Sequence, residues 1–175
     1  MLKCATGRNP KTGVEGGQES LDGYVLNNNE GDAFWFLGTL MTVKAGANET
    51  DRGFTLIECV APPGFAPPPH VHRNEDEAFY LLDGQMSITC GDSTWTVEPG
   101  AFAFLPRGVP HVFSVTGPSP AKMLQFTLPA QFERFAAEMG EPARERTLPP
   151  PAEPDVPRLL EVMGKYGIDL APPAG

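Results

Sequence analysis

The stretch that decides the fold is PPPHVHRNEDEAFYLLDG, residues 67–84. It holds two histidines, His70 and His72, with one residue between them, and Glu77 follows five positions after the second. Residues i and i+2 of a β-strand point to the same face, so both imidazoles can reach one ion from one strand. A turn over residues 73–76 then restarts the chain in the apolar run 78–82, with Glu77 facing inward. The stretch therefore predicts a strand, a turn and a second strand that share a metal site.

The chain contains three histidines, and the third, His111, follows the tight turn Pro106-Arg107-Gly108. A ligand so distant in sequence has to come from another strand and would close the site. Imidazole and carboxylate together suit Zn, Fe, Mn, Co or Ni. The sequence therefore predicts one divalent transition metal held by His70, His72, Glu77 and His111.

Two other carboxylates, Glu75 and Asp76, compete with Glu77 for the role of metal ligand. Glu77 is favoured because it enters the apolar run directly. Glu75 and Asp76 are predicted to be solvated carboxylates of the turn.

The rest of the chain has the pattern of an all-β barrel. Its 19 glycines and 20 prolines divide it into short apolar runs at regular intervals. The predicted strands are residues 23–26, 33–43, 54–60, 77–82, 85–90, 93–97, 101–105, 111–115 and 122–128. The dipeptides Asp83-Gly84 and Gly91-Asp92 predict hairpin turns. The proline-rich residues 62–69 predict an edge strand or a loop that leads into the histidines.

Three regions are expected along the chain. Residues 1–20 are polar and glycine-rich and predict a flexible N-terminal arm. Residues 21–129 are the predicted barrel. Residues 130–175 are predicted to pack on the barrel as two short helices, 130–140 and 157–166, joined by a proline-rich linker.

Composition limits the classes of partner and the compartment. The net charge of −9 argues against nucleic acid and anionic membranes, because both need basic patches. No apolar run is long enough to span a bilayer. The three cysteines, Cys4, Cys59 and Cys90, form no CxxC pair and are expected to be free thiols in a reducing cytoplasm.

The spacing Gly64-x5-His70-x-His72-x4-Glu77-x6-Gly84 resembles the first motif of the cupins. The spacing Gly100-x5-Pro106-x-Gly108-x2-His111 resembles the second motif, with Val115 where the family usually has Asn. More widely, residues 34–38, 67–70, 132–135 and 166–167 resemble the single-domain bacterial quercetin 2,3-dioxygenase-like cupins. The resemblance implies a jelly-roll barrel, commonly a homodimer, with a metal centre of three histidines and one glutamate.

The expected activity follows from the open positions of such a centre. Four protein ligands on an ion that accepts six leave two positions for a chelating substrate or O2. The resemblance also implies that Glu77 is the catalytic base. The leading hypothesis is a dioxygenase that cleaves a flavonol-like or other enolisable aromatic. A polyketide cyclase or isomerase that uses the metal as a Lewis acid, and a small-molecule binding module, remain alternatives.

Strand parity predicts an apolar pocket around the ligands, which favours a small hydrophobic or aromatic substrate. The residues predicted to line this pocket are Phe79, Leu81, Met86, Ile88, Phe102, Phe104 and Phe113, and Trp35 or its neighbours Phe34 and Phe36 are expected to cap one end.

Overall fold

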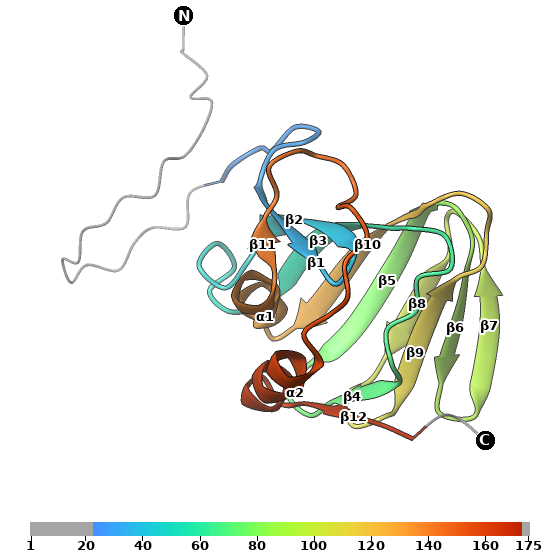
Figure 1. Ribbon diagram of the computed structural model, residues 1–175. Coiled ribbons are helices and arrows are strands. Elements are labelled where there is room, and N and C mark those ends of the chain that lie inside the picture. Colours follow the sequence, from blue (N-terminus) through green and yellow to red (C-terminus); the bar gives the residue numbers. More distant parts are fainter. Residues whose placement is uncertain (1–22, 173–175) are drawn as a thin grey trace, which may run out of the picture.

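The computed structural model describes residues 23–172 of the chain. The predicted N-terminal arm, residues 1–20, lies outside these residues. Within them, most of the chain forms two antiparallel β-sheets that face each other (Figure 1). This arrangement confirms the prediction of an all-β jelly-roll barrel with short C-terminal helices.

The first sheet, called sheet A, has seven strands. In spatial order they are β11 (Glu141–Pro142), β1 (Asp32–Phe36), β2 (Thr39–Ala45), β3 (Thr55–Ala61), β10 (Ala121–Leu128), β5 (Asp76–Asp83) and β8 (Phe102–Leu105). The second sheet, called sheet B, has five strands. Their order is β12 (Ile168–Leu170), β4 (His70–His72), β9 (His111–Val115), β6 (Met86–Cys90) and β7 (Ser93–Val97).

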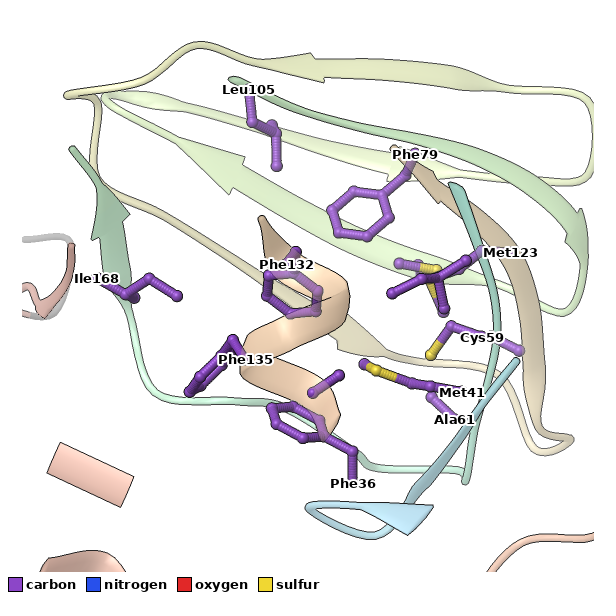
Figure 2. Packing of buried hydrophobic residues seen from close by; sticks show 14 of the residues in the cluster. Phe36, Met41, Cys59, Ala61, Phe79, Leu105, Met123, Phe132, Phe135 and Ile168 are labelled. Carbon is purple, nitrogen blue, oxygen red and sulfur yellow. The ribbon is translucent and has the colours of Figure 1, made fainter. Parts of the chain in front are cut away.

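The core lies between the two sheets and is formed by alternate residues of each strand. In β3, for example, Thr55, Ile57, Cys59 and Ala61 are buried, whereas the residues between them are partly exposed. This alternation is the period-2 pattern of a strand with one face against a core. Figure 2 shows side chains from both sheets and from the first helix meeting in this interior.

Residues 33–43, predicted as one strand, form the hairpin of β1 and β2 instead. The turn is made by Leu37 and Gly38, which have φ angles of 49° and 87°. Two consecutive positive φ values are what a two-residue hairpin turn requires. Residues 23–26, also predicted as a strand, have no regular secondary structure.

The predicted hairpin at Asp83-Gly84 is wrong, because β5 belongs to sheet A and β6 to sheet B. The chain crosses between the sheets here. Gly84 has a φ of 87°, and a Cβ atom at this position would lie 2.8 Å from Cα of Ala121. The second predicted hairpin, Gly91-Asp92, is confirmed, since it joins the paired strands β6 and β7.

Two helices, α1 (Phe132–Met139) and α2 (Val156–Lys165), lie together beside β1, β11 and the pair β4–β12 (Figure 1). The rings of Phe132 and Phe135 on α1 lie 6.1 and 5.2 Å from the ring of Phe36 on β1. Leu159 and Met163 on α2 are buried as well. Among residues 23–172, no helix has the length and apolar character needed to cross a membrane.

Candidate metal centre

The structure brings His70, His72, Glu77 and His111 together in the interior. Strand β4 supplies the first two, β5 supplies Glu77, and β9 supplies His111. Because β4 and β9 are neighbours, His70 lies directly opposite His111 in the ladder. One potential ligand atom from each of the four residues lies within 4.8 Å of all the others. This cluster could hold a metal ion.

Three of the four side chains are almost completely shielded from solvent. His72, Glu77 and His111 are 1%, 2% and 3% exposed, and His70 is partly exposed. A site of this kind can take up an ion from one side while the surrounding sheets exclude bulk water.

Hydrogen bonds fix which ring nitrogen of each histidine faces the cluster. The Nδ1 atoms of His70 and His111 lie 2.9 Å from the carbonyl oxygens of Pro68 and Val109. A carbonyl oxygen can only accept, so each Nδ1 carries the proton and donates it. The Nε2 atom of each neutral ring is left with its lone pair, which is the state that binds a metal.

Two of the ring nitrogens that face the cluster lack hydrogen bonds. Nε2 of His72 and Nε2 of His111 are both buried without a hydrogen-bond partner among the described residues. The latter lies 3.2 Å from Oε2 of Glu77, within ion-pair distance but not in a hydrogen-bonding orientation. Leaving a buried polar atom unpartnered costs roughly 1–3 kcal/mol. A divalent transition metal would satisfy these atoms, so the donor set fits such an ion.

The charges of the cluster at neutral pH also suit a cation. Burial lowers the pKa of His70 to about 4, and the neighbouring histidines oppose its protonation further, although Glu77 acts in the other direction. Burial favours the neutral form of Glu77, but the three histidines outweigh this and lower its pKa to about 2. At neutral pH Glu77 is therefore a carboxylate and His70 is neutral, the forms in which both residues bind metals.

Gln125 is a polar residue of the site that sequence reasoning missed. It lies on β10, and its Nε2 donates a hydrogen bond of 2.6 Å to Oε1 of Glu77. A signal was available, because Gln125 occupies an inward-facing position of the otherwise apolar strand AKMLQFTL. The bond fixes one oxygen of Glu77 and leaves the other directed at the histidines.

The prediction for Glu75 is wrong. It is 1% exposed rather than solvated, and its Oε1 lies 2.8 Å from Nδ1 of His72. Asp76, the other turn carboxylate, is partly exposed and forms an ion pair of 2.6 Å with Arg107. The turn folds Glu75 back beneath the histidine, while the next residue points outward.

A cavity of about 60 Å³ adjoins the cluster, which is room for several water molecules. Its walls are mostly apolar and come from both sheets, both helices and the loop before β4. Besides His70, His72 and Glu77 the lining residues are Phe36, Leu37, Met41, Phe65, Pro67, Pro68, Phe113, Gln125, Phe132, Phe135, Leu159, Met163 and Ile168.

The structure places the predicted pocket residues in three groups. Phe113 lines the cavity. Phe79, Leu81, Met86 and Ile88 are buried deeper, in a part of the core with no space for a water molecule. They support the cavity wall from behind, as the 5.2 Å separation of the Phe79 and Phe113 rings indicates.

The third group lies away from the cavity, and its prediction is wrong. Phe102 and Phe104 are 63% and 54% exposed, because Ala103 and Leu105 are the residues of β8 that face inward. Trp35 does not line the cavity either; its Nε1 donates a hydrogen bond of 2.9 Å to the carbonyl of Thr147 in the linker. The helices supply wall residues that the sequence did not predict.

The protein is a small β-barrel made of two facing antiparallel sheets. Three histidines and a glutamate inside the barrel form a possible metal site. Residues 56–127 match the family model of the cupin domain. The chain therefore carries a cupin domain, and the resemblance of its two motifs to those of the cupins is confirmed.

One curated relative is the quercetin 2,3-dioxygenase of Bacillus subtilis (strain 168), which is 28% identical over 140 residues. The match covers 80% of this chain but only 41% of the length of the Bacillus protein.

Solved structures support the fold. KdgF from a Halomonas species superposes with a TM-score of 0.55 at 14% identity, over 64% of this chain and 99% of that one. An RmlC-like cupin from Shewanella frigidimarina NCIMB 400 gives a TM-score of 0.55 at 13% identity, over 65% and 96% of the two chains.

Proposed function

We propose that this chain is a metal-dependent cupin enzyme, and that it acts as a dioxygenase on a flavonol-like or other enolisable aromatic substrate. The observation that carries the proposal is the complete cluster of His70, His72, Glu77 and His111, of which the first three line a largely apolar cavity. These four residues would hold one divalent Fe, Ni, Mn, Co or Zn ion. The similarity to a quercetin 2,3-dioxygenase supports the substrate class.

When bound, the ion supplies Lewis acidity and, if redox-active, access to O2 chemistry. The protein contributes a base, because Glu77 is ionised at neutral pH and borders the cavity. Gln125 donates a hydrogen bond to Oε1 and so orients the carboxylate, and Glu77 accepts the proton of a substrate hydroxyl when it is not ligating the ion. Ionisation of that hydroxyl makes the substrate electron-rich.

The cavity wall suits a flat, apolar substrate. Phe65, Phe113 and Phe132 of α1 all line the cavity; the first two lie with ring centroids 5.8 Å apart, and Phe132 lies 6.0 Å from the ring of His72. Such rings offer stacking surfaces and exclude water from the reacting atoms. A flavonol matches both features, because its adjacent hydroxyl and carbonyl are polar and its rings are apolar.

The test is an oxygen-electrode screen of protein reconstituted with Fe, Mn, Ni or Co. Flavonols, enediols, diketones and small polyphenols would be offered as substrates. Uptake of O2 with at least one chelating, enolisable compound is expected, with a flavonol as the leading candidate. Absence of uptake with every metal form would contradict a dioxygenase.

A non-redox enzyme, such as a polyketide cyclase or isomerase, is the second candidate. The observation in its favour is the donor set itself, since three imidazoles and a carboxylate also suit Zn. Turnover by the Zn form without O2 consumption would identify it. Tight binding of an aromatic compound without turnover would instead identify a small-molecule binding module.

We also propose that the chain forms a homodimer through the outer face of sheet A. This face presents a band of large apolar side chains on β5, β8 and β10: Tyr80, Leu82, Phe102, Phe104 and Leu128. A second copy related by a two-fold axis can pack the same face of its own sheet A against this band. Exposed apolar patches of this kind mark association surfaces.

A cytoplasmic location is consistent with the free thiols of Cys59 and Cys90.

A further inference from the structure

Glu75 occupies an environment that folding alone does not explain. Its Oε1 bonds to His72, while its Oε2 is buried without a hydrogen-bond partner among the described residues. Burying a carboxylate with one unpartnered oxygen costs free energy, and the residue lies in a turn from which a carboxylate could reach solvent. Its position beneath His72 therefore requires another reason.

The three histidines of the cluster are held in two different ways. His70 and His111 donate from Nδ1 to backbone carbonyls two residues earlier in the chain. His72 has a carboxylate in place of that carbonyl. It lies on β4 where the strand pairs with β12, opposite Ile168, and its acceptor comes from a side chain.

An acceptor at Nδ1 determines what the other nitrogen can do. A neutral imidazole carries one proton, and a partner that only accepts holds this proton at Nδ1. The lone pair then lies on Nε2, which in His72 is the buried, unpartnered atom of the cluster. A carboxylate acceptor also makes the ring a better electron donor than a carbonyl acceptor does.

We propose that Glu75 is a positioning residue of the metal site: it fixes the tautomer and orientation of His72, so that Nε2 faces the ion. This inference rests on the proposed metal-dependent function. The proposal gives Glu75 a role although this carboxylate neither ligates the ion nor touches the substrate.

The test compares two variants of Glu75 with a matched control. Glu75→Leu removes the acceptor and the charge, and Glu75→Gln keeps an acceptor oxygen but removes the charge. The control is Glu133→Gln, which alters another largely buried carboxylate; Glu133 bonds to Thr55 and to the backbone nitrogen of Ala47 rather than to the histidines. Circular dichroism would establish that each variant folds.

The first measurement is the affinity of metal-free protein for Zn²⁺ and Co²⁺ by competition titration. We expect Glu75→Leu to weaken binding about 10- to 100-fold, the usual effect of removing an outer partner of a ligand. Glu75→Gln is expected to weaken binding several-fold, and Glu133→Gln to stay within about threefold. Because Gln preserves the shape of the side chain, it carries the test if the Leu variant fails to fold.

The second measurement is long-range ¹H–¹⁵N NMR of the imidazole rings in metal-free protein, above the pH at which they are protonated. The three histidines give three ring spin systems, and the spectrum of His72→Ala assigns one of them. Wild type should show His72 with its proton on Nδ1. Glu75→Leu should shift His72 toward the other tautomer and leave His70 and His111 unchanged.

Two results would overturn the inference: affinities of both Glu75 variants within threefold of wild type, or an unchanged His72 tautomer in Glu75→Leu. Failure of wild type itself to bind any metal would instead contradict the proposed function, and the tautomer comparison would still decide the role of Glu75.

Discussion

Three consecutive carboxylates, Glu75, Asp76 and Glu77, have three different environments within one turn of the chain. Glu75 is buried against His72, Asp76 is paired with Arg107 near the surface, and Glu77 borders the cavity. Strand geometry separates the last two, since neighbouring residues of β5 point to opposite faces. Each environment leads to a different experiment.

Removing a ligand and removing the base should have different effects. Loss of a hydrogen-bond partner of a ligand typically weakens metal binding roughly 10- to 100-fold. His111→Ala removes a ligand itself, so it is expected to weaken metal binding by more than this and to lower activity as well. Glu77→Gln keeps an oxygen that can ligate but cannot accept a proton, so kcat should fall about 10²- to 10⁴-fold while much of the metal is retained. Metal content and kcat of each variant, measured on the same preparation, decide this. A fully active Glu77→Gln variant would show that Glu77 is not the base.

The ion pair of Asp76 and Arg107 predicts a pH dependence of stability. Hydrogen bonds from the guanidinium and the backbone nitrogen of Arg107 lower the pKa of Asp76 from 3.8 to about 2. A lowered pKa in the folded state means that the stabilisation is present above about pH 4 and is lost as the pH falls toward 2. Asp76→Asn should therefore be less stable than wild type at pH 6, by a modest amount because the pair is partly exposed, and the difference should shrink as the pH falls to 2.

Urea unfolding of both proteins at several pH values between 2 and 6 measures this difference. A difference that stays constant down to pH 2 would be inconsistent with the pair as its source.

At this scale the sequence predicted the gathering of the four cluster residues but not the partners around them. Spacing and strand parity were enough for His70, His72 and Glu77, and the second motif supplied His111. The burial of Glu75 depends on how residues 73–75 fold back toward β4, and a run of polar residues contains no signal for that. Gln125 could have been found, since a polar residue in an inward position of an apolar strand needs a partner.

Among the elements, β4 is the short strand on which the cluster depends. It is three residues long and lies between β9 and the C-terminal strand β12. Strand β12 is anchored further by an ion pair of 3.1 Å between Asp169 and Arg73. The C-terminal segment is therefore part of the site, because it pairs with the strand that carries two of the histidines.

Two substitutions on the same face of β12 should separate its buried end from its exposed end. Ile168 is 3% exposed, lines the cavity and pairs with His72, whereas Leu170 on the same strand is 49% exposed. Ile168→Ala should lower the free energy of unfolding by about 2–5 kcal/mol, and Leu170→Ala by no more than about 0.5 kcal/mol. Urea denaturation of the metal-free protein measures both. Equal losses would mean that β12 does not pack as described.

The elements themselves were predictable where the signal is local. The Gly91-Asp92 hairpin and the two helices follow from neighbouring residues. The Asp83-Gly84 turn has an equally strong local signal, but whether a turn joins two paired strands or two sheets depends on contacts far along the chain, such as those of Gly84 with Ala121. The very short strands β11 and β12 have no periodicity to detect, because they form only by pairing with β1 and β4.

On the scale of the whole molecule, the two helices pack against one side of the barrel, and the outer face of sheet A carries exposed apolar side chains. Residues of helices α1 and α2 line the cavity, whereas Phe102 and Phe104 are exposed on the outer face of sheet A. If this face is a dimer interface, Phe102→Lys combined with Phe104→Lys should convert a dimer of 18.8 kDa chains to monomers with unchanged circular dichroism. Trp95→Lys is the matched control, since Trp95 is an equally exposed aromatic on an edge strand of sheet B. Light scattering coupled to size exclusion measures the mass, and a monomeric wild type would contradict the proposed interface.

The metal content of the purified protein tests most directly whether the three histidines and Glu77 form a metal site. Untagged, purified chain, reconstituted with Fe, Mn, Ni, Co or Zn and freed of unbound ions, would be examined by elemental analysis. We predict about one divalent transition metal per chain, and its loss in His72→Ala and His111→Ala, because ion binding needs the lone pairs that these side chains direct into the cluster. A well-folded wild-type protein that retains none of the five metals, or retains one equally well without His72 and His111, would contradict the account.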